Sequence, residues 1–145
     1  MQKHDRQSES LEDLAARGLR LGREVALLAR DMQPGADSQE VAYLQRCLSP
    51  LRDDKVFDRL HEGGFEAALT RLRALRDAEE LGRHREFMGF QDPEGDAVGI
   101  VQEVVEYSDH GRALAGLVDR LETVLALRRD VLDRLEAERL LLGRT

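Results

Sequence analysis

The last third of the chain has apolar residues at alternating steps of three and four positions. The pattern starts just after His110 and continues to Leu142. Such spacing puts the apolar side chains on one side of a helix and is typical of a helix packed lengthwise against others. The stripe consists of Leu114, Leu117, Leu121, Val124, Val131, Leu135 and Leu142. We therefore predict one long amphipathic helix over residues 110–142, about 45 Å in length at 1.5 Å per residue.

Two charged residues, Arg128 and Glu138, interrupt this stripe. Arg128 stands between Val124 and Val131, where an aliphatic residue would continue the pattern. A buried guanidinium without a partner costs several kcal/mol, so something must compensate it. Either the arginine stem covers apolar surface while its head reaches solvent, or the head meets an acid, a partner subunit or a bound anion. In the second case the position sets helix register, oligomeric state or ligand choice.

The same spacing predicts an N-terminal helix that starts after Ser10 and ends near residues 33–35. Ser10 is a suitable N-cap, and Asp13 three positions later approximates a capping box. Gly18 and Gly22 lie along the apolar stripe and would let another backbone approach closely. We interpret them as a tight contact within the chain, with a dimer or ligand groove as the alternative.

Further helices are predicted between residues 38 and 82. The capping signature at 37–40 opens a helix that Pro50 ends or kinks, because proline disfavours helical geometry in the residue before it. A short helix follows, which ends at Gly63-Gly64, and another extends from Phe65 to about Gly82. The helical spacing of apolar residues is then lost between residues 83 and 95. Three large apolar residues in this connector are expected to plug one end of a bundle: Phe87, Met88 and Phe90.

The segment 96–107 is ambiguous between helix and strand. Its valines and isoleucine favour a strand by composition. On a helix, however, Val98, Val101 and Val105 would share one face, and no second strand-like segment is evident to pair with it. Asp92-Pro93-Glu94 is also a good helix start, with a proline at the first helical position. We therefore predict a helix here, followed by a break at residues 108–111.

Composition supports a helical fold. Aromatic residues make up 4% of the chain, there is no tryptophan, and only three prolines occur. The core must be built from leucine, valine and alanine, which suits helix bundles. We predict an all-α protein: an elongated up-and-down bundle of four to five helices with a long C-terminal helix. One domain is expected over residues 1–145, with 1–9 disordered.

The chain is acidic, with a formal net charge of −7. This charge opposes binding to nucleic acid or to an anionic membrane surface. The single Cys47 excludes an intramolecular disulfide framework, and no apolar segment has the length of a signal sequence or a membrane span. We therefore expect a cytoplasmic protein.

One polar cluster is a candidate metal site. On a helix, Glu103, Glu106 and His110 would occupy positions i, i+3 and i+7 of one face. The carboxylate metal proteins of helical bundles need Glu-x-x-His motifs on two helices, and the chain has none. We interpret the cluster as a solvated polar face and predict no metal, no cofactor and no catalytic residue.

Strong packing stripes without a convergent set of reactive groups favour a non-enzymatic interaction or regulatory protein. We expect it to be a homodimer that acts through helix–helix contacts, and a separate protein partner is a further possibility. The interaction candidates are Arg128, Glu138, Gly18 and Gly22. One alternative is a small helical enzyme or ligand-binding protein with a charged pocket lined by Arg128 and Glu138. A third is a metal-binding bundle that uses Glu103, Glu106 and His110.

Overall fold

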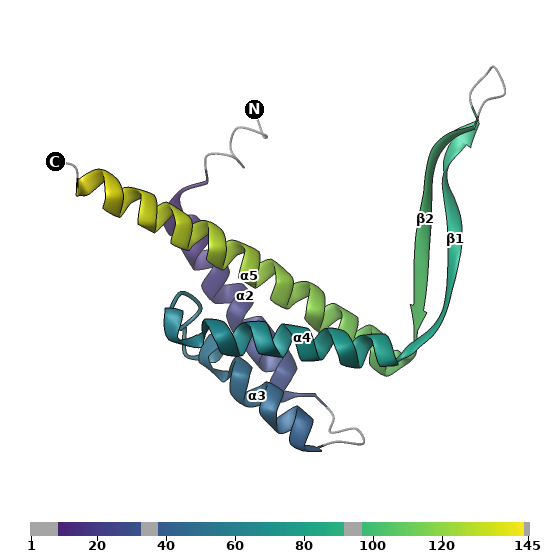
Figure 1. Ribbon diagram of the computed structural model, residues 1–145, viewed down its shortest axis with the longest axis horizontal. Coiled ribbons are helices and arrows are strands. Elements are labelled where there is room, and N and C mark those ends of the chain that lie inside the picture. The colour runs from purple at the N-terminus through teal and green to yellow at the C-terminus, as the bar shows by residue number, and fades with distance from the viewer. Residues whose placement is uncertain (1–8, 33–37, 92–96, 144–145) are drawn as a thin grey trace.

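The computed structural model describes residues 9–32, 38–91 and 97–143. In these residues four α-helices form a body, and a two-stranded antiparallel hairpin projects from it (Figure 1). In chain order the elements are α2 (Leu11–Arg30), α3 (Ser38–Arg52), the 3₁₀ helix η1 (Arg59–His61), α4 (Glu62–Ala78), β1 (Glu80–Gln91), β2 (Ala97–Tyr107) and α5 (Asp109–Leu142).

The body is a bundle in which α2 and α4 each pack against both α3 and α5. All four helices contribute to one aliphatic core, together with Val56 from the connection after α3. Phe65 is the largest side chain that is fully buried there, so the core is otherwise leucine, valine and alanine. A second, smaller cluster joins the start of α2 to α5 through Leu14, Leu127 and Val131. The predicted aliphatic helical core is confirmed.

The N-terminal helix starts as predicted. Ser10 is the N-cap of α2, and its side chain accepts a hydrogen bond from the backbone N–H of Asp13 at 3.0 Å. This bond satisfies one of the donors that a helix leaves free at its first turn. The predicted stop at Gln33-Pro34-Gly35 lies outside the described residues, and α2 itself ends at Arg30.

The predicted boundaries around Pro50 and Gly63-Gly64 are wrong. Helix α3 continues through Pro50 to Arg52. The chain then turns at Asp54, which has a φ of 61°. Instead of a short helix, the connection buries Val56 and enters η1, where Asp58 caps the N–H of Leu60 at 2.9 Å. Gly63 and Gly64 lie in the first turn of α4 and do not end a helix.

The prediction of an all-α protein is also wrong, because residues 80–91 and 97–107 are paired strands and the fold is mixed α and β. The strands pair antiparallel from Glu80↔Tyr107 at the root to Gln91↔Ala97, with one irregularity between Glu80 and Gly82. The segment predicted as an ambiguous helix is therefore β2. Its partner β1 begins at Glu80, inside the helix predicted to extend to about Gly82, which ends at Ala78 instead, and continues into the segment without a clear pattern. The predicted helix start at Asp92-Pro93-Glu94 lies outside the described residues.

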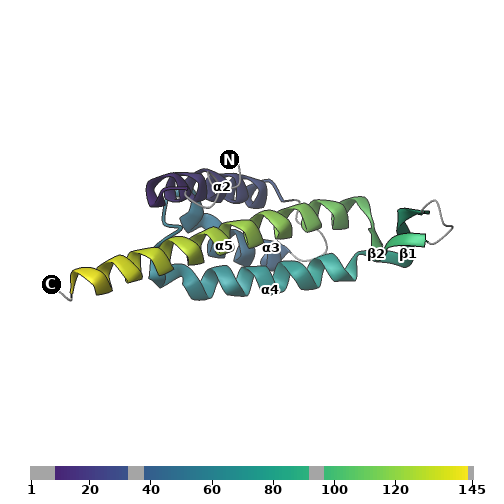
Figure 2. The same cartoon turned by 90° about the horizontal axis from the view of Figure 1, so that it is seen from above.

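The long C-terminal helix is confirmed. Ser108 caps α5, which has 34 residues and a length of about 51 Å. Figures 1 and 2 show α5 extending beyond the other helices at its C-terminal end. Its buried side chains stop at Val131, so the last part of the predicted stripe is not packed: Leu135 and Leu142 are exposed. None of the described helices is long and apolar enough to cross a membrane.

Residues 1–8, most of the segment expected to be disordered, lie outside the described part of the chain.

Candidate functional site: the β-hairpin arm

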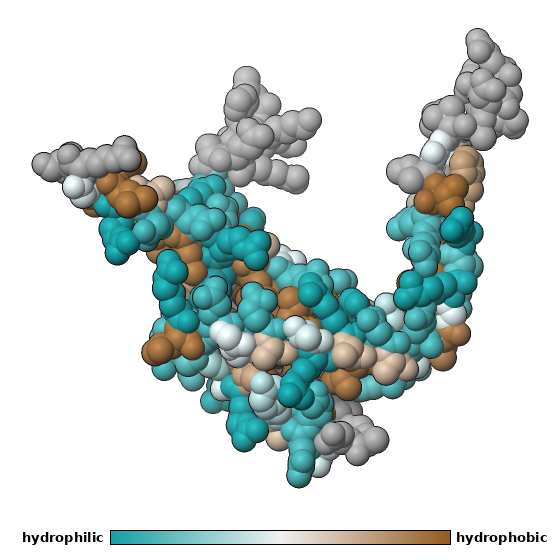
Figure 3. All heavy atoms as spheres, viewed as in Figure 1, coloured by the Kyte–Doolittle hydropathy of each residue, from teal (hydrophilic) through white to brown (hydrophobic). Residues whose placement is uncertain are grey.

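Strands β1 and β2 form an arm that stands clear of the helices (Figures 1 and 3). Each strand has 11 or 12 residues, about twice the usual strand length, and the arm is about 36 Å long. Its contacts with the body are concentrated where β2 meets α5. Most of the backbone hydrogen-bonding groups on the two outer edges of the arm are therefore open to solvent.

The root of the arm is held by a polar junction. Ser108 Oγ accepts a hydrogen bond from the N–H of Gly111 at 3.0 Å and donates one to Glu79 Oε2 at 2.6 Å. The Ser108 N–H also donates to the Glu79 carbonyl at 3.1 Å. Gly111 is required here, because a Cβ at this position would lie 2.7 Å from the Cβ of Glu79 and 2.8 Å from that of Tyr107. The junction thus joins the end of α4 to the start of α5 beneath both strands.

Charged side chains connect the two strands near the root. Arg83 forms an ion pair with Glu80 on its own strand and another with Glu103 of β2 at 3.0 Å. His84 Nε2 lies 2.9 Å from Glu86, and its Nδ1 lies 3.6 Å from Glu106. The hydrogen bond that the His84 ring donates to Glu86, with the negative charges of Glu86 and Glu106, raises the pKa of His84. The same kind of pairing with Glu80 and Glu103 raises the pKa of Arg83.

Farther from the root, the arm exposes apolar side chains. Phe87 and Val101 are direct cross-strand partners, yet they are 55% and 61% exposed. Figure 3 shows apolar surface on the arm facing solvent. The expected role of Phe87 as a plug at the end of the bundle is wrong, while the side chains of Met88 and Phe90 lie outside the described structure. A solvent-facing aromatic on an otherwise isolated hairpin marks a surface that another molecule can cover.

The predicted polar cluster of Glu103, Glu106 and His110 does not form. Because residues 97–107 are a strand, Glu103 and Glu106 bind different residues of β1, and His110 lies in the first turn of α5. No group of three or more possible metal ligands is found among the described residues. The proposed metal face therefore depended on a helix that the chain does not make.

Arg128 and Glu138 do not line a common pocket. Arg128 is 5% exposed, and its Nε donates to the carbonyl of Val56 at 2.8 Å while Nη1 donates to Glu62 at 3.2 Å. Glu138 is exposed, ten positions or about 15 Å farther along α5. Arg128 thus meets an acid of a neighbouring helix, and the interpretation in which its head reaches solvent is wrong.

The two glycines of α2 face the connection after α3. A Cβ on Gly18 would lie 2.9 Å from the ring of Phe57, and one on Gly22 would lie 2.7 Å from Val56 Cγ2. Both glycines are buried in this contact within the chain.

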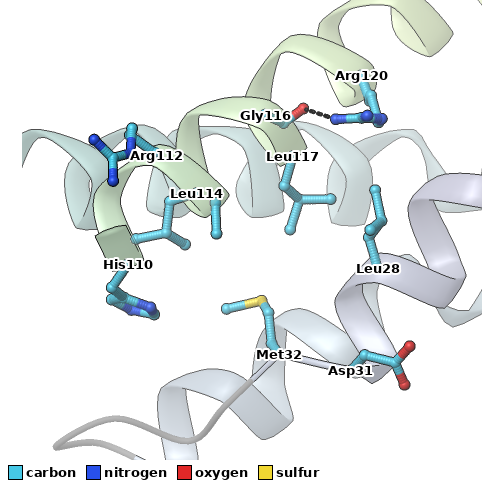
Figure 4. Close-up of a pocket in the computed structure, with 10 residues that line it drawn as sticks. Leu28, Asp31, Met32, His110, Arg112, Leu114, Gly116, Leu117 and Arg120 are labelled. Atoms are coloured by element: carbon cyan, nitrogen blue, oxygen red, sulfur yellow. Dashed lines mark hydrogen bonds between the residues drawn. The ribbon is translucent and has the colours of Figure 1, made fainter. Parts of the chain in front are cut away.

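A groove of about 370 Å³ lies between the end of α2 and the start of α5 (Figure 4). Its apolar lining includes Leu28, Met32 and Leu117, and its rim carries charged residues. These charges are already paired within the chain: Arg112 with Asp109, Arg120 with Glu24 and the Gly116 carbonyl, and Asp31 with Arg30. The groove is thus apolar, with charged groups held at its margin.

No protein-family model, curated protein sequence or solved structure matches the chain. The site is therefore defined by geometry alone. Sequence reasoning missed its central residues, Phe87 and Val101. One signal pointed to them: the Gly-, Pro- and Asp-containing segment 92–96 separates two runs with large apolar residues, as a hairpin turn does.

Proposed function

We propose that this protein is a non-enzymatic interaction protein that holds a protein partner with the arm. The observation that carries the proposal is the exposed Phe87–Val101 pair on a long hairpin that no described helix covers. A two-stranded hairpin alone is marginally stable in water, and three strands or a packed helix are normally needed. A partner that adds a strand or covers this face would supply the missing contacts.

The polar groups of the chain favour this function over the alternative of a ligand pocket. Arg128 already donates two hydrogen bonds within the chain, to the Val56 carbonyl and to the Glu62 carboxylate. Glu138 lies apart from it on α5. The arginines at the rim of the apolar groove are paired with acids or carbonyls of the same chain. The arm, in contrast, combines open backbone edges with exposed apolar side chains.

Site-specific photocrosslinking tests the proposal. A benzoylphenylalanine at Phe87 in the full chain, expressed in cells of the source organism, should give covalent adducts with another polypeptide chain after irradiation. The control is the same amino acid at Leu60, an apolar residue of the body that is 87% exposed. Mass spectrometry identifies the adducts. Adducts of equal yield from both positions, or none from Phe87, would contradict the proposal.

A further inference from the structure

We propose that the partner of the arm is the arm of a second copy, joined edge to edge through β2. This inference rests on the proposed function and names the partner. Two hairpins would then form one four-stranded antiparallel sheet in the order β1-β2-β2-β1, with a two-fold axis between the β2 strands. The chain would be a homodimer held by its arms.

The two edges of the arm differ in how they are protected. β1 carries four consecutive charged or titratable residues, 83–86, and an irregularity near its root. Charged side chains and irregularities are the features by which natural edge strands avoid pairing. Residues 97–105 of β2 hold a single charge, at Glu103, no proline, and several β-branched residues. The open edge of β2 is therefore suited to accept another strand, and that of β1 is not.

The sequence of β2 is compatible with antiparallel pairing to itself. With the two-fold axis at Val101, the Val101 residues of the two copies face each other, and Glu103 lies opposite Gly99 of the second copy. No acid of the paired segment 97–105 then faces another acid, and β-branched residues meet across the axis, which stabilises antiparallel pairs. Tyr107, at the root, is six residues from the axis, so the two roots would lie about 40 Å apart. The helical bodies thus occupy opposite ends of the sheet.

This arrangement also accounts for the exposed apolar pair and for where assembly stops. Phe87 lies directly across from Val101, so the axis at Val101 makes one apolar row of four side chains across the sheet. Both outer edges would be β1, the charged edge, so a third copy finds no open strand to join. A two-fold contact of this kind closes, whereas pairing β1 with β2 would continue into a fibre.

Disulfide crosslinking in the full-length protein tests the register. In a Cys47→Ala background, Val101→Cys puts one thiol at the axis, where antiparallel partners have Cα atoms about 5 Å apart, within the range of a disulfide. Arg85→Cys is the matched control, since it sits on β1 of the same arm and would lie three strand spacings across the sheet and four residues along it from its copy, about 20 Å away. Under mild oxidation Val101→Cys should form a linked dimer at least tenfold faster than the control. Equal rates would overturn the proposal.

Sedimentation equilibrium gives the second measurement. The wild-type chain should be a dimer, and Val101→Lys should weaken dimerisation at least tenfold, because it places two ammonium groups together at the axis. Unchanged hydrogen-exchange protection of the amides that pair β1 with β2 shows that the arm of the variant remains folded. A monomeric wild type, or a dimer that Val101→Lys leaves intact, would overturn self-pairing.

Photocrosslinking at Phe87 distinguishes a failure of self-pairing from a failure of the proposed function. Adducts with a different protein, without a Val101→Cys dimer, would leave the proposed function standing and overturn self-pairing. No adduct at all would overturn both.

Discussion

Among the described residues, Arg128 is the one charged side chain that is buried. It lies on α5 and binds the carbonyl of Val56, in the connection after α3, and the carboxylate of Glu62, at the start of α4. The arginine therefore ties three parts of the bundle together. Its Nη2 has no hydrogen-bond partner in the described structure, which reduces the net benefit of burying the group.

Replacing Arg128 by leucine should lower the free energy of unfolding by about 1–3 kcal/mol. The reason is that the buried Val56 carbonyl loses its side-chain donor, and an unsatisfied buried acceptor costs about this much. Glu62 is half exposed, so water can solvate its carboxylate in the variant. The control is Arg129→Leu at the exposed neighbouring position, which should change stability by about 0.5 kcal/mol or less. Urea denaturation measures both, and equal effects would refute the role assigned to Val56.

Glycine substitutions on two helices should have opposite effects. Gly22→Ala places a methyl group 2.7 Å from Val56 Cγ2 in a packed contact, which should cost about 1–3 kcal/mol. Gly63→Ala is the matched control, because nothing lies within 4 Å of its added Cβ and alanine is the better helix former by up to about 1 kcal/mol. Thermal melts should therefore move down for Gly22→Ala and up for Gly63→Ala. Melting temperatures that shift in the same direction would show that the side chains around Gly22 move aside at little cost.

At the scale of elements, the arm is held together by side-chain pairs across its strands. Glu103 and Glu106 of β2 reach Arg83 and His84 of β1, with Glu80 and Glu86 completing the charged group near the root. All of these residues except the partly buried Glu80 are exposed, so each pair contributes little by itself. Together they favour one register, since a shift of one residue would move every side chain to the other face.

The arm should become less stable as the pH rises above neutrality. His84 has a raised pKa in the folded arm, against about 6.5 in an unfolded chain. Protonation of His84 thus favours the paired hairpin: the stabilisation is complete below about pH 6.5 and is lost as the pH rises through the higher folded value. Hydrogen-exchange protection of the β1 and β2 amides, corrected for intrinsic rates, should fall between pH 5.5 and 8.5. In His84→Gln this fall should disappear; its persistence would assign the effect to other groups.

At the scale of the whole molecule, the arm and the body do not share a core. No described residue of 80–107 belongs to either apolar cluster, and the helices bury one another. The root junction of Glu79, Ser108 and Gly111 lies on the body side of the strands. The body therefore holds its own structure, and the arm is an attachment whose stability depends on local pairing and on whatever covers it.

Removal of the arm should leave the body folded. Glu80 and Tyr107 are paired at the root, so an Asn-Gly turn can replace residues 81–106 between them. The variant should keep its helical circular dichroism, and its free energy of unfolding should stay within about 1 kcal/mol of the wild type, because no core contact is lost. A molten or aggregated product would show that the arm contributes to the core in a way the described contacts do not reveal.

The amino-acid sequence by itself determined the first and the last described helix of this protein, α2 and α5. The three-four spacing and the cap at Ser10 are local features, so α2 could be predicted with its start. The start of α5 was predicted to within one residue, although Ser108, expected in a break, is its N-cap. The aliphatic core follows from composition in the same way.

Only the tertiary structure decided the arm, the partner of Arg128 and the unpacked end of α5. β1 has no clear apolar periodicity, and its strand state depends on pairing with β2, in which Arg83 meets Glu103 twenty residues away. Likewise, Arg128 finds Val56 across 72 positions of the chain. Such contacts are set by which segments meet in space, and the local period of one segment carries no information about them. For the same reason Leu135 continues the stripe of α5 in sequence and yet is exposed, since no other described helix extends far enough to cover it.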